Sequence, residues 1–154
     1  MYKIIFLDID GVLNSSLWRK SKTYSTDKSL DGNLADIDPD TVDRLNQITD
    51  NTGACIVVSS TWRWGWAQDF LGMLAFFRKV GVTGKVIDIT PINDDGRHQQ
   101  IQQWLDMTDD VDAFVILDDI DWFAGILHKY LVLTDPRVGL QNADVQSAIQ
   151  ILNK

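Results

Sequence analysis

Five short apolar runs, separated by helical patterns, constrain the fold of this chain more than any other feature of its sequence. The runs are rich in β-branched residues and are bounded by turn residues; they occupy residues 3–7, 54–58, 85–89, 113–117 and 130–133. Continuous apolar runs of this length are typical of strands that are buried on both faces. We therefore expect them to form the strands of one central sheet.

The helical patterns lie at residues 39–52, 66–80, 97–107, 120–127 and 142–152. The first has clear boundaries, because Asp38 is a suitable N-cap, Pro39 stands at the first helical position and Gly53 follows the last turn. Strands that alternate with helices predict an α/β fold, here a doubly wound, mostly parallel sheet with helices on both faces. We expect residues 1–154, of which 45% are apolar, to form a single domain.

Residues 14–38 form a long break in this alternation, polar and rich in Ser, Lys and Asp. Loops of this length inside compact domains are usually either covers of active sites or disordered segments, and this one directly follows the acids of residues 8–10. Within it, residues 18–28 are basic, with Arg19, Lys20, Lys22 and Lys28 against only one acid, Asp27. We expect a cap-like, mobile excursion that covers the site and attracts an anionic substrate; the alternative is a solvated loop that faces away from the site.

Composition narrows the class of protein. The formal net charge of −8 disfavours a protein that holds long nucleic acid by general charge attraction. The single cysteine, Cys55, lies in an apolar run and is expected to be a buried structural thiol. No run approaches the roughly 18 apolar residues of a membrane span, and the N-terminal run is too short for a signal peptide. We expect a cytoplasmic protein with no membrane association; no stable protein partner can be inferred.

Acids and hydroxyls follow three of the apolar runs; they are Asp8 and Asp10, Ser59 and Ser60, and Asp118 and Asp119. Because ligands bind outside the carboxyl ends of the strands in an open parallel sheet, we expect these side chains to meet at one edge. Carboxylates gathered there repel one another unless a cation lies among them. Magnesium prefers oxygen ligands, whereas two histidines and one cysteine are too few for a zinc site. The sequence therefore predicts a Mg²⁺ site.

Together these residues resemble the four motifs of the haloacid dehalogenase-like (HAD) superfamily of phosphohydrolases. The resemblance is carried by the string DIDGVLN, the hydroxyls of VVSST, a basic residue that opens a later helix and the double acid of ILDD, and it runs from residue 4 to about 123. The strings SSTWR and VILDD are similar to small members linked to nucleotide dephosphorylation or nucleic-acid end repair. The resemblance implies a Rossmann-like core with a minimal cap.

The resemblance implies that Asp8 is the nucleophile that accepts the phosphoryl group and that Asp10 is the acid that protonates the leaving oxygen. The chemistry of the residues agrees, because an aspartyl-phosphate divides a slow hydrolysis into two easier displacements and a second carboxyl can supply and then recover a proton. Ser59 would bind the phosphoryl oxygens, with Ser60 beside it. Gly11 would allow the tight turn after the strand.

The family's third motif is a cation, usually Lys, that neutralises charge on the phosphoryl group. Arg97, at the start of a predicted helix, is our first candidate. Lys85 is the competitor, although it begins a predicted strand and would lie at the far edge of the sheet.

The resemblance also implies how magnesium is held. Asp119 would be a direct ligand and Asp118 a more distant or water-mediated one. The carboxylate of Asp8 and a backbone oxygen of Asp10 would complete the protein's share of the metal site.

Substrate contacts are expected from Trp62 or Trp18, which could stack on a base, and from Arg63, which could clamp a phosphate. Trp66 and Trp104 have the helical spacing of core residues. The predicted activity is Mg²⁺-dependent hydrolysis of a phosphomonoester through an aspartyl-phosphate. Its substrate would be a small phosphorylated molecule such as a nucleotide, or a nucleic-acid end, and the sequence leaves both open.

Two other functions remain. One is a phosphate-binding or regulatory module of the same fold without turnover, although such a module would usually lose an acid. The other is a phosphotransferase that uses the same aspartyl-phosphate.

Overall fold

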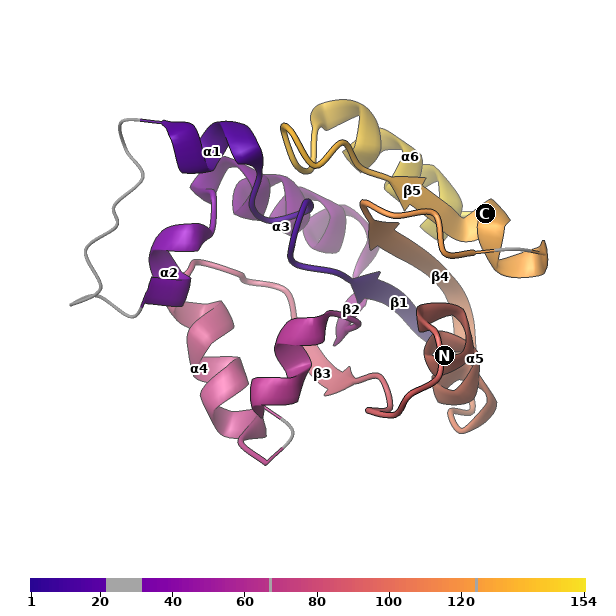
Figure 1. Cartoon of the computed structure of the whole chain (residues 1–154). Helices are drawn as coiled ribbons and strands as arrows, with labels where there is room; N and C mark the ends of the chain where they lie inside the picture. Colours follow the sequence, from indigo (N-terminus) through magenta and orange to yellow (C-terminus); the bar gives the residue numbers. More distant parts are fainter. Residues whose placement is uncertain (22–31, 67, 124) are drawn as a thin grey trace.

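Five parallel strands form one sheet in the order β3-β2-β1-β4-β5 (Figure 1). The structure is a computed structural model that describes residues 1–21, 32–66, 68–123 and 125–154. The strands are β1 (Tyr2–Leu7), β2 (Cys55–Val58), β3 (Val86–Ile89), β4 (Val111–Asp118) and β5 (Leu131–Leu133). All five predicted strands are therefore confirmed, with small shifts at their ends.

Helices cover both faces of this sheet (Figure 1). On one face, Ile5 and Leu7 of β1 share a buried apolar cluster with residues of α3 (Pro39–Thr52), α4 (Phe70–Lys79) and α6 (Asn142–Leu152). On the other face, the alternate β1 residues Ile4 and Phe6 share a second cluster with α5 (Arg97–Asp106) and η2 (Gly125–Tyr130). The expected doubly wound α/β architecture is thus present, and the central strand is buried on both faces.

Helix α3 begins and ends where its sequence signals predict. The Asp38 side chain accepts a hydrogen bond from the backbone N–H of Asp40 at 3.0 Å, and Pro39 opens the helix. Gly53 ends it in the left-handed conformation, with φ of 70°. The helices predicted at 97–107 and 142–152 are also confirmed, as α5 and α6.

The pattern at 66–80 places a helix start too early. A 3-10 helix, η1 (Thr61–Trp66), precedes α4, which begins only at Phe70. The side chain of Asp69 caps α4 by accepting from the N–H of Gly72 at 2.9 Å, so the helix begins after this aspartate.

The α-helix predicted at 120–127 is wrong. Asp118 and Asp121 accept hydrogen bonds from the backbone N–H groups of Ile120 and Phe123, each two residues further on. Such local turns compete with helical hydrogen bonding. A 3-10 helix, η2, follows instead and starts at Gly125, whose φ is 65°.

Two short helices flank the part of the excursion that lies outside the described residues, namely residues 22–31 with Lys22 and Lys28. They are α1 (Ser16–Lys20) and α2 (Gly32–Asp36). The indole N–H of Trp18 donates to the carbonyl of Ala35 at 3.1 Å, which ties the two helices to each other. The predicted cap-like excursion thus has two helical ends that lie close together.

The described helices include none that combines the length and apolar character of a membrane span. Cys55 is half-buried at the start of β2.

Candidate active site

Three carboxylates meet where β1 and β4 end. These strands pair in parallel with Leu7 opposite Leu117, so the next residues, Asp8 and Asp118, stand side by side. With Asp119 they form a cluster in which one oxygen of each carboxylate lies within 4.8 Å of the others. Asp8 and Asp118 are only 7% and 1% exposed. The edge predicted from the sequence is therefore the place where these acids gather.

Arg97 is the cation that faces this cluster. It opens α5, and its Nη1 donates to Asp118 Oδ2 at 3.0 Å and to the backbone carbonyl of Ser59, while lying 3.6 Å from Asp8 Oδ1. Lys85 is exposed and directly precedes β3, at the opposite end of the sheet from these acids. Of the two cations that the sequence left open, only Arg97 lies at the site.

Burial controls the protonation of the clustered acids. It raises the pKa of Asp118 to about 7, with a further rise from the neighbouring Asp8 carboxylate and an opposing effect of Arg97. Burial also raises the pKa of Asp8, against the lowering effect of Arg97 and of the Ile9 N–H, which donates to Asp8 Oδ1 at 2.8 Å. The pKa of Asp119 is raised by the same cause. One arginine therefore does not balance three carboxylates, and a further cation would favour their ionised forms.

Asp10 has different surroundings from the clustered acids. Its side chain is half-exposed and accepts hydrogen bonds from Asn14 Nδ2 at 2.9 Å and from the indole N–H of Trp62 at 3.0 Å. Arg19 Nη2 lies 3.5 Å from the same carboxylate. Asp10 is thus held by two neutral donors and by Arg19, and half of its side chain remains open to solvent.

Gly11 makes room for one of the clustered acids. Its φ of 75° is in the left-handed region, and a Cβ at this position would stand 2.4 Å from Asp119 Oδ2. Its N–H donates to Asn14 Oδ1 at 2.8 Å, and its carbonyl accepts from the Thr134 hydroxyl at 2.8 Å. Sequence reasoning missed both partners. Asn14 stands within the DIDGVLN string, whereas nothing in the sequence pointed to Thr134.

The hydroxyls after β2 lie next to the nucleophile candidate. Ser60 is fully buried, hydrogen-bonds to the Asp8 side chain and accepts from the backbone N–H of Trp62 at 3.3 Å. Ser59 is 2% exposed, and its hydroxyl has no hydrogen-bond partner among the residues that the structure describes. A buried hydroxyl without a partner is costly, so Ser59 is available to a ligand oxygen.

Arg63 is buried beneath the site. Its guanidinium donates to the carbonyl of Ser60 at 2.6 Å and to Gln100 Oε1 at 2.6 Å, joining η1 to α5. Burial lowers its pKa to about 10, with a further lowering from the nearby Arg97. Arg63, the expected phosphate clamp, therefore donates most of its hydrogen bonds to protein oxygens. It also lines a cavity of about 260 Å³ beside Arg97.

Of the tryptophans considered from the sequence, Trp62 lies at the site, whereas Trp66 and Trp104 pack in the core. Trp62 donates to Asp10 and packs against Trp66 and Phe76, with ring centroids 6.2 and 5.8 Å away, which makes it part of the wall of the site. Trp104 is buried and Trp66 packs on the core, as their spacing predicts.

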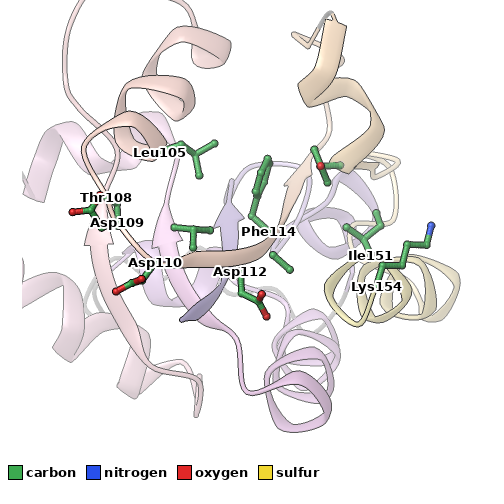
Figure 2. A pocket seen from close by; sticks show the side chains of 11 residues that line it. Leu105, Thr108, Asp109, Asp110, Asp112, Phe114, Ile151 and Lys154 are labelled. Atoms are coloured by element: carbon green, nitrogen blue, oxygen red, sulfur yellow. The ribbon is translucent and has the colours of Figure 1, made fainter.

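A larger cavity of about 540 Å³ lies at the opposite end of β4 (Figure 2). Asp110 and Asp112, at the start of this strand, line it together with Phe114. It is separated from Asp8 and Asp118 by the length of the strand. The candidate active site is therefore the carboxylate cluster, which does not line the larger cavity.

The sequence of residues 4–145 matches the family described as the HAD domain in Swiss Army Knife RNA repair proteins. The chain belongs to this family. The matched residues contain most of β1, all of the other four strands and the cluster around Asp8 and Asp118. Membership supports a phosphatase or hydrolase-type enzyme in RNA repair, as the resemblance implied. No curated protein and no solved structure matches the chain.

HAD domains generally use a divalent metal, and the residues of this one fit such an ion. The donors in reach are all carboxylate oxygens, from Asp8, Asp118 and Asp119, which are ligands that hard divalent cations prefer. Gly11 leaves the space that the Asp119 carboxylate occupies. The site can therefore hold a divalent ion between β1 and β4.

Proposed function

We propose that this HAD domain is a Mg²⁺-dependent phosphomonoester hydrolase that removes a terminal phosphate from a nucleic-acid end. The observation that carries the proposal is the meeting of the buried Asp8 and Asp118, the half-buried Asp119 and the cation Arg97 at the carboxyl edge of the sheet. The family's description, which names RNA repair, supports a polynucleotide end over a free nucleotide. Free nucleotides are the alternative substrate, and the screen below compares them with oligonucleotide ends.

In the first half of the reaction, a carboxylate oxygen of Asp8 attacks phosphorus and the bond between phosphorus and the ester oxygen breaks. Asp10 gives its proton to that oxygen, so the nucleic acid leaves as an alcohol. In the second half, water attacks the aspartyl-phosphate, Asp10 takes a proton from it, and phosphate leaves with the original carboxylate restored.

The remaining residues orient the phosphoryl group and offset its charge. Arg97 lies beside the nucleophile and favours its ionised form, against the burial that raises the pKa of Asp8. The unpartnered hydroxyl of Ser59 can donate to a phosphoryl oxygen. When bound by Asp8, Asp118 and Asp119, magnesium would supply positive charge opposite the phosphoryl oxygens.

A substrate screen tests the proposal directly. We would measure phosphate release, with and without Mg²⁺, from single-stranded RNA and DNA carrying a 5′- or 3′-phosphate, from mononucleotides and from an aryl phosphate. We expect Mg²⁺-dependent release that is fastest from oligonucleotide ends. Asp8→Asn should abolish it, because an amide is a poor nucleophile.

The matched control is Asp112→Asn, which makes the same charge change at an exposed position in the first half of β4. It should keep full activity. Absence of turnover on every substrate would instead favour the phosphate-binding module, and transfer of phosphate to an added alcohol would indicate a phosphotransferase. Turnover by Asp8→Asn at the parent rate would overturn the mechanism.

A further inference from the structure

The cavity of about 260 Å³ beside the carboxylate cluster has the features of a base-binding site. Its walls come from η1, from the start of α5 and from the segment after β4, and they include Trp64 and Trp122. Arg97, which faces Asp8, also lines this cavity. A ligand in the cavity and a phosphate at Asp8 would therefore both contact Arg97.

Trp64 and Trp122 differ from the other tryptophans near the site. Each is 53% exposed, and among the described residues neither indole stacks on another ring or donates its N–H. By contrast, Trp18, Trp62 and Trp104 all donate their indole N–H to a protein oxygen. Two large exposed rings that line one cavity are a surface on which a flat aromatic ligand can stack.

The charge of the cavity suits a nucleotide. Two cations, Arg97 and the buried Arg63, line it against one acid, Asp95, whose carboxylate accepts from Gln103 Nε2 at 2.8 Å. Within the described part of the chain, the Nε of Arg63 has no hydrogen-bond partner. Gly96, also on its wall, is the N-cap of α5 and offers no side-chain cap, so the first N–H groups of this helix are open to an acceptor. Aromatic faces beside cationic donors match a base attached to a sugar phosphate.

We propose that this cavity binds the nucleobase of the terminal nucleotide, stacked on Trp64 or Trp122, while its phosphate lies at Asp8. The inference rests on the proposed function and adds to it the part of the RNA that the protein recognises. Stacking tolerates every base, so the site would favour a nucleotide end over a bare sugar phosphate without strong preference among bases.

The test compares RNA oligonucleotides that carry a base on the phosphorylated terminal nucleotide with identical ones that are abasic there. For the parent protein we expect kcat/KM to be about tenfold higher with the base, mainly through KM, as one stacked base would produce. In the double variant Trp64→Leu/Trp122→Leu this preference should fall close to one. The variant Trp64→Phe/Trp122→Phe keeps two rings and should restore most of it.

Binding separates failure of this inference from failure of the proposed function. Asp8→Asn protein would be titrated with labelled forms of the same oligonucleotides, so that affinity is read without turnover. A parent that treats base-bearing and abasic ends alike, in both turnover and binding, would overturn the base site while leaving the hydrolase intact. If no oligonucleotide is hydrolysed, the proposed function fails. Tighter binding of base-bearing ends that disappears in the leucine variant would then still support the base site. Equal binding of base-bearing and abasic ends would overturn the base site.

Discussion

At the level of single residues, two aspartates that are neighbours in the sequence meet different environments. Asp8 is buried and faces Arg97, whereas Asp10 is half-exposed and held by Asn14 and Trp62. In the first environment Arg97 opposes the burial that raises the pKa of Asp8. The second environment suits a group that gains and loses a proton. Their division of labour can be tested separately from the overall activity.

Asp10→Asn should affect substrates according to their leaving groups. An amide cannot donate the proton that an alkoxide leaving group needs, so kcat on an oligonucleotide or alkyl phosphate should fall by about 10² to 10⁴. An aryl phosphate with a good leaving group should lose far less in the first half-reaction, measured as the burst of released phenol. Equal losses on both substrates would indicate that Asp10 acts mainly through the metal site.

The pKa shifts predict how metal-free protein responds to pH. The pKa of Asp118 in the folded state is about 7 against an ordinary value of 3.8, so the folded state holds this proton while the unfolded chain has lost it. The contribution of this group to stability therefore declines as pH rises between these values. Thermal unfolding in a chelator should show this decline, and Asp118→Asn should make it shallower.

Magnesium should reverse that trend. Metal binding requires ionised carboxylates, so Mg²⁺ should raise the melting temperature more at pH 8 than at pH 5. Asp119→Asn should weaken the increase at both values. An equal increase at pH 8 in Asp119→Asn and in the parent would contradict the assignment of this residue to the metal.

At the level of elements, the turn after β1 decides whether the acids can gather. Gly11 takes a left-handed conformation that brings its backbone against the Asp119 carboxylate. Gly53, at the end of α3, has a similar φ of 70° but nothing within 4 Å of an added Cβ. The two glycines thus share one backbone requirement and differ in their surroundings.

Gly11→Ala and Gly53→Ala form a matched pair. Both should lose about 1–2 kcal/mol of unfolding free energy, because an L-residue is strained at this φ. Only Gly11→Ala should also displace Asp119 and so lose the Mg²⁺-induced rise in melting temperature. Denaturant titration with and without Mg²⁺ measures both effects; a Gly11→Ala protein that binds Mg²⁺ like the parent would show that the metal does not need this space.

At the level of the whole molecule, charge is unevenly distributed. The net charge is −8, yet α1 ends in Arg19 and Lys20, and Arg19 lies 3.5 Å from Asp10. Lys22 follows outside the described residues. Arg19 is engaged with Asp36 at 2.6 Å and approaches Asp10, so it contributes to the order of the site as well as to its field. We predict that this basic segment attracts the anionic substrate.

Replacing Arg19, Lys20 and Lys22 by Ala should raise KM several-fold at low salt. The increase should shrink as ionic strength rises, since exposed charges are screened over about 10 Å at about 0.1 M salt. The double variant Lys20→Ala/Lys22→Ala keeps the contact of Arg19 with Asp10 and isolates the electrostatic part. Steady-state kinetics over a range of salt concentrations measures both.

The control is a second triple variant, in which Arg78, Lys79 and Lys85 are replaced by Ala. It removes the same charge from exposed positions outside the basic segment. It should change KM less at low salt. The same increase in both triple variants would mean that net charge, and not the position of the segment, governs substrate attraction.

The sequence by itself determined the α/β class, the five strands and the edge at which the acids meet. Continuous apolar runs indicate buried strands, which can be recognised from a few neighbouring residues. A parallel sheet then brings the carboxyl ends of its strands to one edge, independent of the connecting loops. Asp8, Asp118 and Asp119 could therefore be predicted as neighbours from their positions after strands. The sharp limits of α3 were predictable for the same reason, because its cap and its terminal glycine act within a few residues.

Contacts between distant segments were decided only by the tertiary structure. The choice of Arg97 over Lys85 depends on which end of the sheet each one reaches, and the role of Thr134 depends on packing between β5 and the β1 turn. The predicted helix at 120–127 failed because Asp118 and Asp121 accept hydrogen bonds from backbone N–H groups two residues further on, and these bonds outweighed helical periodicity. Exposure separated Trp64 from Trp62, because hydrophobicity is the same for both and only packing decides which indole meets solvent.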